Sequence, residues 1–332
     1  MKYKTFAAIT GILILLLAIS CKKEDDPTSS YLSGTISLTY PEYVSAGFTK
    51  SFSIDTLTTL NRAGEYDKIG YYLVDYNNKM DTLIFADGTV KSHTFSITAP
   101  DTLATLSAML SGYAEGYYTS SASVRYTVAN DKSITGIEHS PEDTLFTDKR
   151  DGKRYYTAVQ DSSVWLASNL KWKGAGHPFA DCPVMTDLFG QYYTWEEANS
   201  ACPEGWHLPS DREWVSLAVK YGADASSKVL EDIKGAAGDL MADAYFNGDK
   251  MWEYWPDVKI TNKSGLAVLP LGYASIAEGA YSFTGKNKYA IFWTSDECDG
   301  FGVYRSFYVD KNMIFTGKAS KTDFAASVRC VK

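Results

Sequence analysis

Histidine and cysteine are too scarce in this chain for the common metal and catalytic sites. The 332 residues contain four histidines and five cysteines, and neither a Cys-x-x-Cys nor a His-x-x-x-His pair occurs. The sequence also has no nucleophile elbow and no phosphate-binding loop. His207, between Trp206 and Leu208, is expected to be a packed residue with satisfied nitrogens. From these absences we expect that the protein is not an enzyme and that it has no zinc site.

Clusters of basic residues are missing as well. The chain has 32 Lys and Arg against 40 Asp and Glu, which gives a formal net charge of -8. Nucleic acid and anionic membrane surfaces both bind to clustered positive charge. Neither is therefore expected to be a partner, and the only membrane contact that we expect is a covalent lipid.

The first residues have the pattern of a secretory signal. Lys2 and Lys4 precede an apolar stretch from Phe6 to Ile19, and small residues lead to Cys21. This stretch is shorter than the roughly 20 residues that span a bilayer. We expect residues 1–20 to be a signal peptide cleaved before Cys21, with lipid on the new N-terminal cysteine, rather than an uncleaved anchor.

Residues 21–30 are expected to be a flexible tether. Lys22 and Lys23 are followed by the acidic residues Glu24 to Asp26 and by small polar residues, which cannot bury apolar surface. A lysine followed by acidic residues behind a lipidated cysteine resembles the surface-export signal of Bacteroidetes lipoproteins. That resemblance implies an outer-membrane lipoprotein exposed on the cell surface.

A shift in composition divides the remainder. All eight tryptophans lie between Trp165 and Trp293, whereas residues 31–135 have none and are rich in Ser, Thr and Tyr. Residues 136–144 contain Pro141 and acidic residues that interrupt regular structure. We expect a first domain over residues 31–135, a linker over 136–144 and a second domain over 145–332.

The first domain is expected to be all-β. Leu106, Ala108 and Leu110 alternate with serines, and the segment 121–128 repeats this period of two. Further strands are expected at 32–39, 48–54, 69–76, 82–85 and 94–98, with a hairpin turn at 77–79. Seven short strands in this length predict an immunoglobulin-like sandwich.

The tripeptide Asp-Thr-Leu occurs four times, beginning at residues 55, 81, 101 and 143. Asp-Thr is an ordinary pair in turns and at strand edges. The tripeptide also resembles the O-glycosylation acceptor of Bacteroidetes surface proteins. Under that second interpretation the attachment points are Thr56, Thr82, Thr102 and Thr144, and both interpretations remain open.

Long ordered motifs fill the second domain. They are Val164-Trp-Leu-Ala-Ser-Asn-Leu170, Gly190-Gln-Tyr-Tyr-Thr-Trp195, Cys202-Pro-Glu-Gly-Trp-His-Leu-Pro-Ser210, Gly265-Leu-Ala-Val-Leu-Pro-Leu-Gly272, Phe292-Trp-Thr-Ser295 and Ser327-Val-Arg-Cys330. Together they resemble the Fibrobacter succinogenes major paralogous domain. That family resembles the C-type lectin fold, so the expected fold is an all-β N-terminal sandwich followed by an α+β C-type-lectin-like domain.

Capping patterns support two short helices in this domain. Thr194 with Glu197, and Ser210 with Glu213, have the spacing of capping boxes, and apolar residues follow each at helical spacing. A β-rich region and a terminal strand at residues 326–331 are expected after the helices.

The four cysteines that follow Cys21 are Cys182, Cys202, Cys298 and Cys330. In an oxidising compartment they are expected to form disulfides, with three possible connectivities. The resemblance to lectin-like domains implies a bond between Cys202 and Cys330, which leaves Cys182 for Cys298.

The second domain offers two kinds of ligand contact, aromatic side chains and acidic residues that could bind calcium. Trp252, Tyr254, Trp255, Tyr273 and Tyr281 lie in the region that forms variable binding loops in lectin-like folds, although Trp252 and Trp255 also suit a core position. Asp296, Glu297 and Asp299 offer oxygen ligands to calcium, but the calcium-binding sequences of C-type lectins are missing, so no cofactor is required.

From the sequence we therefore expect a surface lipoprotein that presents a lectin-like domain to glycan or protein ligands. The alternative is a structural component of the cell envelope that has no soluble ligand.

Overall fold

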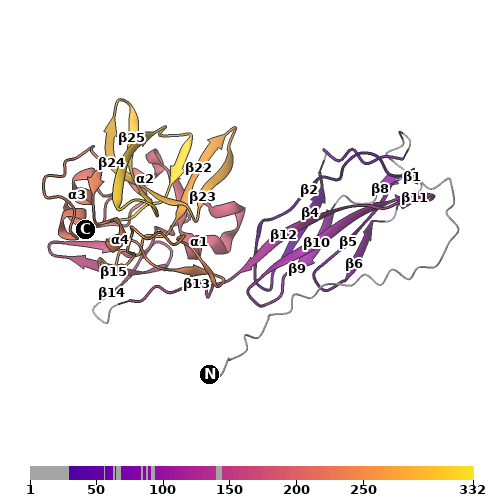
Figure 1. The fold of residues 1–332 in the computed structure, drawn as a ribbon, viewed down its shortest axis with the longest axis horizontal. Coiled ribbons are helices and arrows are strands. Elements are labelled where there is room, and N and C mark those ends of the chain that lie inside the picture. The colour runs from indigo at the N-terminus through magenta and orange to yellow at the C-terminus, as the bar shows by residue number, and fades with distance from the viewer. Residues whose placement is uncertain are drawn as a thin grey trace, which may run out of the picture.

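The computed structural model has two β-rich domains side by side (Figure 1). It describes residues 30–55, 57–62, 64, 69–83, 85–86, 89–90, 94–139 and 144–332. The expected signal peptide and Cys21 lie outside these residues. Within the described part, no helix combines the length and the apolar character needed to cross a membrane.

The N-terminal domain contains two facing sheets. The larger sheet has the order β3-β12-β10-β5-β6 and the smaller the order β2-β4-β9. Their strands are β2 Leu38–Thr39, β3 Tyr43–Ser45, β4 Thr49–Ile54, β5 Gly70–Val74, β6 Met80–Leu83, β9 Thr94–Thr98, β10 Ala104–Tyr113 and β12 Ser120–Ala129. Two small pairs lie apart from them: β1 Ser30–Tyr31 with β11 Tyr117–Tyr118, and β7 Phe85–Ala86 with β8 Thr89–Val90.

Residues of both sheets share one apolar core. Phe52 and Phe95 from the smaller sheet meet Leu110 and Tyr126 from the larger, with the rings of Phe52 and Tyr126 5.4 Å apart. The alternation predicted for β10 and β12 is confirmed at Ala108, Leu110, Val124, Tyr126 and Val128, which are all buried, but Ser111, expected on the wet face, is buried too. Burying one face of each sheet is what holds the two sheets together.

The prediction for residues 32–39 was wrong in extent. Only Leu38–Thr39 forms a strand there, while Ser33 makes an isolated bridge to Asn61. Strand β3, which runs parallel to β12, was not predicted. The turn predicted at residues 77–79 is present between β5 and β6, where Asn78 has a φ of 59°.

The C-terminal domain combines four α-helices with strands. The helices are α1 Pro183–Phe189, α2 Trp195–Ala201, α3 Asp211–Lys220 and α4 Ala237–Leu240, and the 3-10 helix η1 Phe179–Asp181 precedes α1. Both predicted capping boxes are confirmed at α2 and α3. His207 is exposed rather than packed, and its Nε2 lies 2.8 Å from Glu213 Oε1.

The strands of this domain form one long mixed sheet and two small ones. The long sheet has the order β17-β18-β27-β22-β24-β25-β26-β19, with β23 paired to β22. Its strands are β17 His177–Pro178, β18 Gln191–Thr194, β19 Ile233–Lys234, β22 Leu271–Ala277, β23 Ala280–Lys286, β24 Tyr289–Cys298, β25 Phe301–Tyr308, β26 Met313–Ala319 and β27 Phe324–Ala326. The small sheets contain β14 Thr144–Thr147, β15 Arg154–Gln160 and β16 Ser163–Leu166, and β13 Ile134–Thr135, β20 Tyr245–Phe246 and β21 Asp249–Lys250.

The end of the chain closes the domain. The disulfide implied for Cys202 and Cys330 is present and joins the end of α2 to the last residues. The terminal strand lies at Phe324–Ala326 and not at 326–331. Beyond it the chain makes isolated bridges instead, and Val331 pairs with Trp165 and His207.

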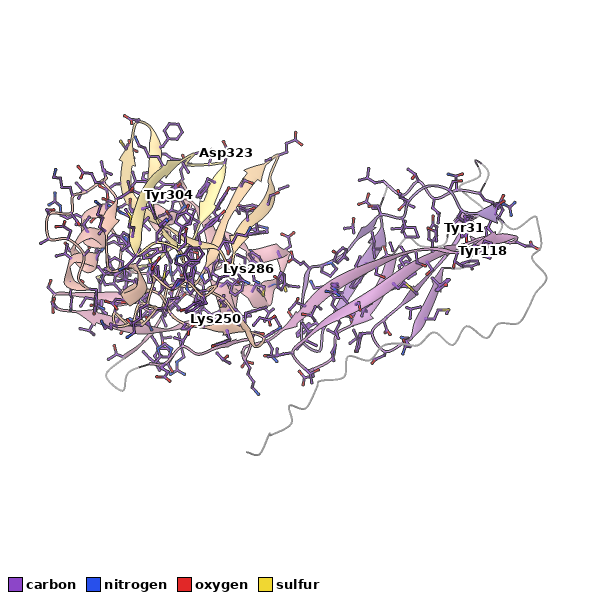
Figure 2. The ribbon with its side chains drawn as sticks, in the orientation of Figure 1. Tyr31, Tyr118, Lys250, Lys286, Tyr304 and Asp323 are labelled. Atoms are coloured by element: carbon purple, nitrogen blue, oxygen red, sulfur yellow. A yellow bond between two sulfur atoms is a disulfide. The ribbon has the colours of Figure 1, made fainter. Side chains whose placement is uncertain are left out.

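The two domains meet through a shared apolar cluster. The ring of Tyr43 from β3 lies 5.4 Å from that of Phe179 and 6.1 Å from that of Phe246. Lys286 completes this contact, with its Nζ 5.8 Å from the centre of the Tyr43 ring, and Figure 2 shows it on the side of the C-terminal domain that faces the sandwich. Tyr31 and Tyr118 pack together at the opposite end of the sandwich, with their ring centres 4.8 Å apart (Figure 2).

The chain changes domain earlier than the expected linker. Strand β13, at residues that we assigned to the sandwich, pairs with β20 of the C-terminal domain. The side chain of Asn247 donates to the Val128 carbonyl at 2.8 Å, and its backbone N–H donates to the Ser133 carbonyl. These backbone contacts fix the end of β12 against the second domain.

Candidate functional site

The predicted binding aromatics separate into buried and exposed residues. Trp252 is fully buried, and its Nε1 donates to the Val268 carbonyl at 3.1 Å, so it belongs to the core and is not a ligand contact. Tyr254 and Trp255 are 79% and 42% exposed. The core position that we considered for Trp255 is thus wrong, and its ring is available at the surface.

Tyr273 lies within an aromatic stack on the long sheet. Its ring centre is 4.5 Å from that of Phe324 and 6.1 Å from that of Tyr289. Both neighbours are half-buried, as is Tyr273 itself. This residue contributes mainly to packing between β22, β24 and β27.

Tyr281 borders a groove between the two domains. Strand β23 alternates in exposure, which places Tyr281 and Phe283 on one face. Phe283 packs on Phe179 with ring centres 4.9 Å apart, while the Tyr281 ring stacks on His177 at 4.1 Å. Burial raises the pKa of Tyr281, and the nearby Glu197 raises it further, so the hydroxyl stays protonated.

The groove has a volume of about 690 Å³ and mixed walls. The sandwich contributes the exposed ring of Tyr40, the carboxylate of Glu42 and the ammonium of Lys50, together with hydroxyls of Thr49, Ser51 and Ser53. Asp181 lies on the opposite wall, and its Oδ1 is 3.2 Å from His177 Nε2. The groove therefore combines aromatic rings with polar groups of both charges.

Sequence reasoning identified only one wall of this groove. Tyr40, Glu42 and Lys50 were missed because they lie more than 200 residues from Tyr281. Their side of the groove forms only because Tyr43 inserts between Phe179 and Phe246. A local pattern in the chain carries no signal for such a contact between domains.

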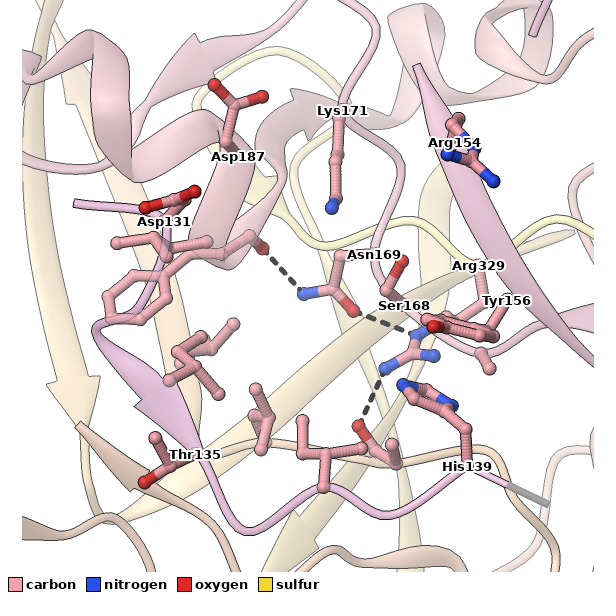
Figure 3. Close-up of a pocket in the computed structure, with 18 of the residues that line it drawn as sticks. Asp131, Thr135, His139, Arg154, Tyr156, Ser168, Asn169, Lys171, Asp187 and Arg329 are labelled. Atoms are coloured by element: carbon pink, nitrogen blue, oxygen red, sulfur yellow. Dashed lines mark hydrogen bonds between the residues drawn. The ribbon is translucent and has the colours of Figure 1, made fainter. Parts of the chain in front are cut away.

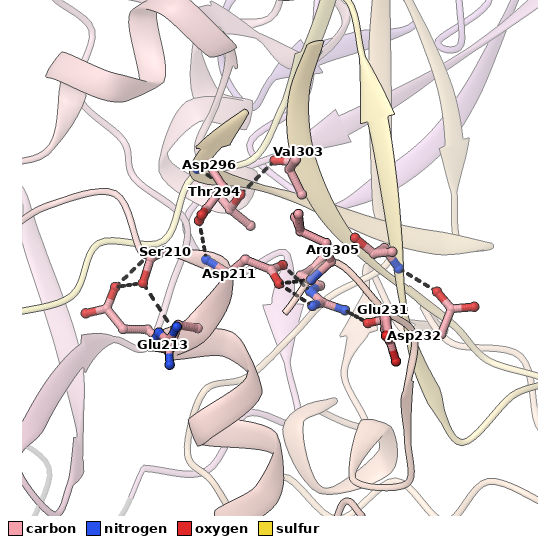
Figure 4. Close-up of polar contacts among 12 residues, drawn as sticks. Ser210, Asp211, Glu213, Glu231, Asp232, Thr294, Asp296, Val303 and Arg305 are labelled. Carbon is pink, nitrogen blue, oxygen red and sulfur yellow. Dashed lines mark hydrogen bonds and ion pairs between the residues drawn. The ribbon is translucent and has the colours of Figure 1, made fainter. Parts of the chain in front are cut away.

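The three acidic residues predicted as calcium ligands have separate partners. Asp296 Oδ2 accepts from the backbone N–H of Asp211 at 2.6 Å, at the start of α3 (Figure 4). Glu297 is paired with Lys321, and Asp299 with Lys318. Among the described residues, no group of three or more acidic, histidine or cysteine side chains is placed to hold a metal.

The polar contact at Asp211 continues into the domain interior. Its carboxylate accepts two bonds from Arg305, and both side chains are fully buried (Figure 4). Asp211 Oδ2 also accepts from the backbone N–H of Leu230, and Arg305 donates to the Glu231 carbonyl. This network fixes α3 to β25 and to the 230–231 loop.

The predicted bond between Cys182 and Cys298 is wrong, since both cysteines are free. Cys182 is buried beside α1, in the cluster that also contains Tyr43. Cys298 is the last residue of β24, at the turn of the β24–β25 hairpin, and its sulfur contacts Lys318 Nζ at 3.2 Å. The two sulfurs therefore belong to different parts of the fold.

The four threonines of the Asp-Thr-Leu repeats fall at different places. Thr102 and Thr144 are exposed, and the Thr144 hydroxyl lies 2.6 Å from that of Thr157. Thr82 lies in β6, whereas Thr56 lies outside the described residues. The two threonines whose side chains the structure describes are thus both exposed.

Comparison with known proteins places the C-terminal part of the chain in a family. Residues 150–332 match the family model described as the Fibrobacter succinogenes major domain. Neither a curated protein nor a solved structure matches the chain.

Proposed function

The chain belongs to the Fibrobacter succinogenes major domain family, and from this premise we propose that it is an exported, lipid-anchored protein that binds glycans. In this proposal an immunoglobulin-like sandwich carries a C-type-lectin-like domain, and the glycan occupies the groove between them. The protein is anchored in the outer membrane through Cys21 and faces the outside medium.

Two features support the proposed fold assignments. Two facing antiparallel-rich sheets with a shared core suit an immunoglobulin-like sandwich, although the parallel pairing of β3 with β12 has to be accommodated. Two capped helices followed by a long sheet, with a disulfide from the first of them to the chain end, suit a lectin-like domain.

The observation that carries the glycan proposal is the composition of the groove around Tyr281. A sugar ring offers an apolar face to an aromatic ring and hydroxyls to carboxylates and ammonium groups. Tyr40 and Tyr281 supply rings, and Glu42, Lys50 and Asp181 supply polar partners. An open groove also accommodates a polymer better than an enclosed cavity does.

Exposed aromatics on another surface favour a second candidate, contact with a protein. Tyr254 and Trp255 are adjacent and exposed, in the loop between β21 and β22. Exposed Trp and Tyr side chains are enriched where proteins bind one another. In this alternative the chain is an assembly component of the envelope, and the loop is its contact surface.

Binding of the full-length protein, solubilised in detergent, to a glycan array tests the proposed function. We expect selective binding to at least one class of glycan, unchanged by a calcium chelator, because Asp296, Glu297 and Asp299 have separate partners. Absence of binding to every glycan would contradict the proposal and favour the assembly role.

The anchoring proposal has its own test in the mass of the native protein. We expect removal of residues 1–20 and the added mass of acyl chains on Cys21, both of which a Cys21→Ser variant should lack. A native protein that retains its first twenty residues would contradict this part of the proposal.

A further inference from the structure

A second cavity lies within the C-terminal side of the molecule, with the connecting segment 131–139 as one of its walls (Figure 3). Its volume of about 490 Å³ is within the range of small-molecule sites. None of the residues that line the groove at Tyr281 lines this cavity. Any ligand here is thus independent of the proposed glycan.

Arg329 lies at this cavity and carries a buried charge that no carboxylate neutralises. Its side chain is 1% exposed, and its guanidinium donates to Asn169 Oδ1 at 2.8 Å and to three backbone carbonyls. Those four bonds leave one N–H on Nη2 without an acceptor among the described residues. Burial lowers the pKa of Arg329 to about 9, because the charged guanidinium is removed from water there.

Arg305, the other fully buried arginine, shows the usual arrangement in the same domain. Its guanidinium makes two hydrogen bonds to the carboxylate of Asp211. Buried arginines are almost always paired in this way, because an unpaired charge is costly to remove from water. The environment of Arg329 therefore lacks the anion that the environment of Arg305 contains.

Lys171 gives a second, independent indication. Figure 3 shows its side chain directed into the cavity, and its Nζ makes no hydrogen bond or ion pair with any described residue. The nearest lining carboxylate on α1, Asp187, is paired with Lys153. Burial lowers the pKa of Lys171, with Asp187 opposing and Lys153 and Arg329 adding to the effect.

The remaining charges and walls define the kind of ligand. Arg154 on β15 also lines the cavity without an ion pair, and Asp131 is the one lining carboxylate, among the described residues, that has no cation partner. The rest of the wall combines the polar side chains of Thr135, His139, Tyr156 and Ser168 with aliphatic and aromatic ones, which include Ile134, Ile137, Leu145, Leu188, Phe189 and Leu269. A ligand with one anionic group and an apolar body complements both parts.

We propose that this cavity is a binding site for a small carboxylate with an apolar body. The carboxylate lies between Lys171 and the Asn169–Arg329 pair, and the apolar body lies against the connecting segment. The site is formed by residues of both the connecting segment and the C-terminal domain, so a bound ligand also stabilises the contact between them.

Calorimetric titration of the full-length protein with 4-phenylbutyrate tests the proposal, with 4-phenylbutyramide as the uncharged control. We expect the carboxylate to bind about tenfold or more tightly than the amide, since a charge-assisted hydrogen bond contributes that much. Equal affinity for the two compounds, or no heat from the carboxylate at millimolar concentration, would overturn it.

Two matched variants locate the site. Lys171→Gln should weaken 4-phenylbutyrate binding about tenfold, whereas Lys173→Gln removes the same charge from an exposed position outside the cavity and should leave the affinity unchanged. Equal affinity in wild type and Lys171→Gln would overturn the proposal. Arg329 is left intact because its bonds to three backbone carbonyls, in two segments of the chain, also hold the fold.

Discussion

Arg305 and Asp211 form a fully buried ion pair in which two parallel hydrogen bonds of 2.6 Å join the guanidinium to the carboxylate. The pair connects β25 to the first turn of α3, which are 94 residues apart in sequence. Because neither group reaches solvent, each depends on the other for its charge to be tolerated.

Removal of one member of this pair should therefore be strongly destabilising. We expect Asp211→Ala to lower the free energy of unfolding by about 3–5 kcal/mol, because it leaves the Arg305 charge buried and unpaired. The double variant Asp211→Ala with Arg305→Met should recover part of this loss. Denaturant unfolding of the three proteins measures both effects, and additive losses in the double variant would show that the two residues act independently.

The cysteines give a prediction about covalent structure. In the native protein Cys298 should react with iodoacetamide, while Cys182, whose thiol pKa is raised by burial, should react only after unfolding. Mass spectrometry without reductant should thus count one labelled thiol in the native state and two in denaturant. A protein with no free thiol in denaturant would restore the Cys182–Cys298 bond.

Loss of the Cys202–Cys330 bond should cost stability because it closes a loop of 128 residues in the unfolded chain. The loop-entropy model gives about 4–5 kcal/mol for a closure of this length. The double variant with Cys202→Ser and Cys330→Ser should therefore unfold at a much lower denaturant concentration than wild type. The double serine variant of Cys182 and Cys298, which breaks no disulfide, is the control.

Gly272 is a position where only glycine fits. Its φ is +65°, and an added Cβ would lie 1.8 Å from the Thr284 carbonyl oxygen on the paired strand β23. Gly248 also has a positive φ, of +89°, but a Cβ there meets nothing within 4 Å. Both alanine variants share the backbone strain, so Gly272→Ala should be less stable than Gly248→Ala by about 1–3 kcal/mol. Equal melting temperatures would mean that β23 moves away at no cost.

The capping box of α3, formed by Ser210 and Glu213, should make the protein less stable at acidic pH. Burial alone would raise the pKa of Glu213, but hydrogen bonds from Ser210 and from His207 outweigh it and leave the pKa below its ordinary value of 4.5. A depressed folded-state pKa gives stability that is present above pH 4.5 and is lost as the pH falls through the folded value. The gap in melting temperature between wild type and Glu213→Gln should shrink as pH falls below 4.5. Glu204→Gln, at an exposed position, should show no such change.

Local patterns predicted the local elements of this fold well. The two capping boxes, the alternation of β10 and β12, and the Cys202–Cys330 bond were all expected from short motifs or from family resemblance, and all are present. Each depends on residues close in sequence or on a recurrent fold feature. The Cys182–Cys298 pairing failed because it was assigned only by elimination.

The candidate sites were harder to predict because both depend on contacts between distant segments. The groove requires Tyr40 and Tyr281 on opposite walls, and the cavity requires Lys171 and Arg329 beside the connector. The family motif contains Arg329, but only its surroundings show that no carboxylate neutralises it. Trp252 is fully buried, whereas Trp255, three residues later, is 42% exposed. Composition alone could not reveal this difference.

The affinity of tyrosine variants for the glycan identified on the array tests the central claim most directly. We predict that Tyr281→Ala loses binding by about tenfold, because the variant loses both the ring stacking, about 0.5–1.5 kcal/mol, and the apolar area that the ring buries. Tyr254→Ala should bind as wild type does, and both proteins should keep their melting temperature. Unchanged binding by Tyr281→Ala, or loss of binding in Tyr254→Ala alone, would contradict a glycan site between the two domains.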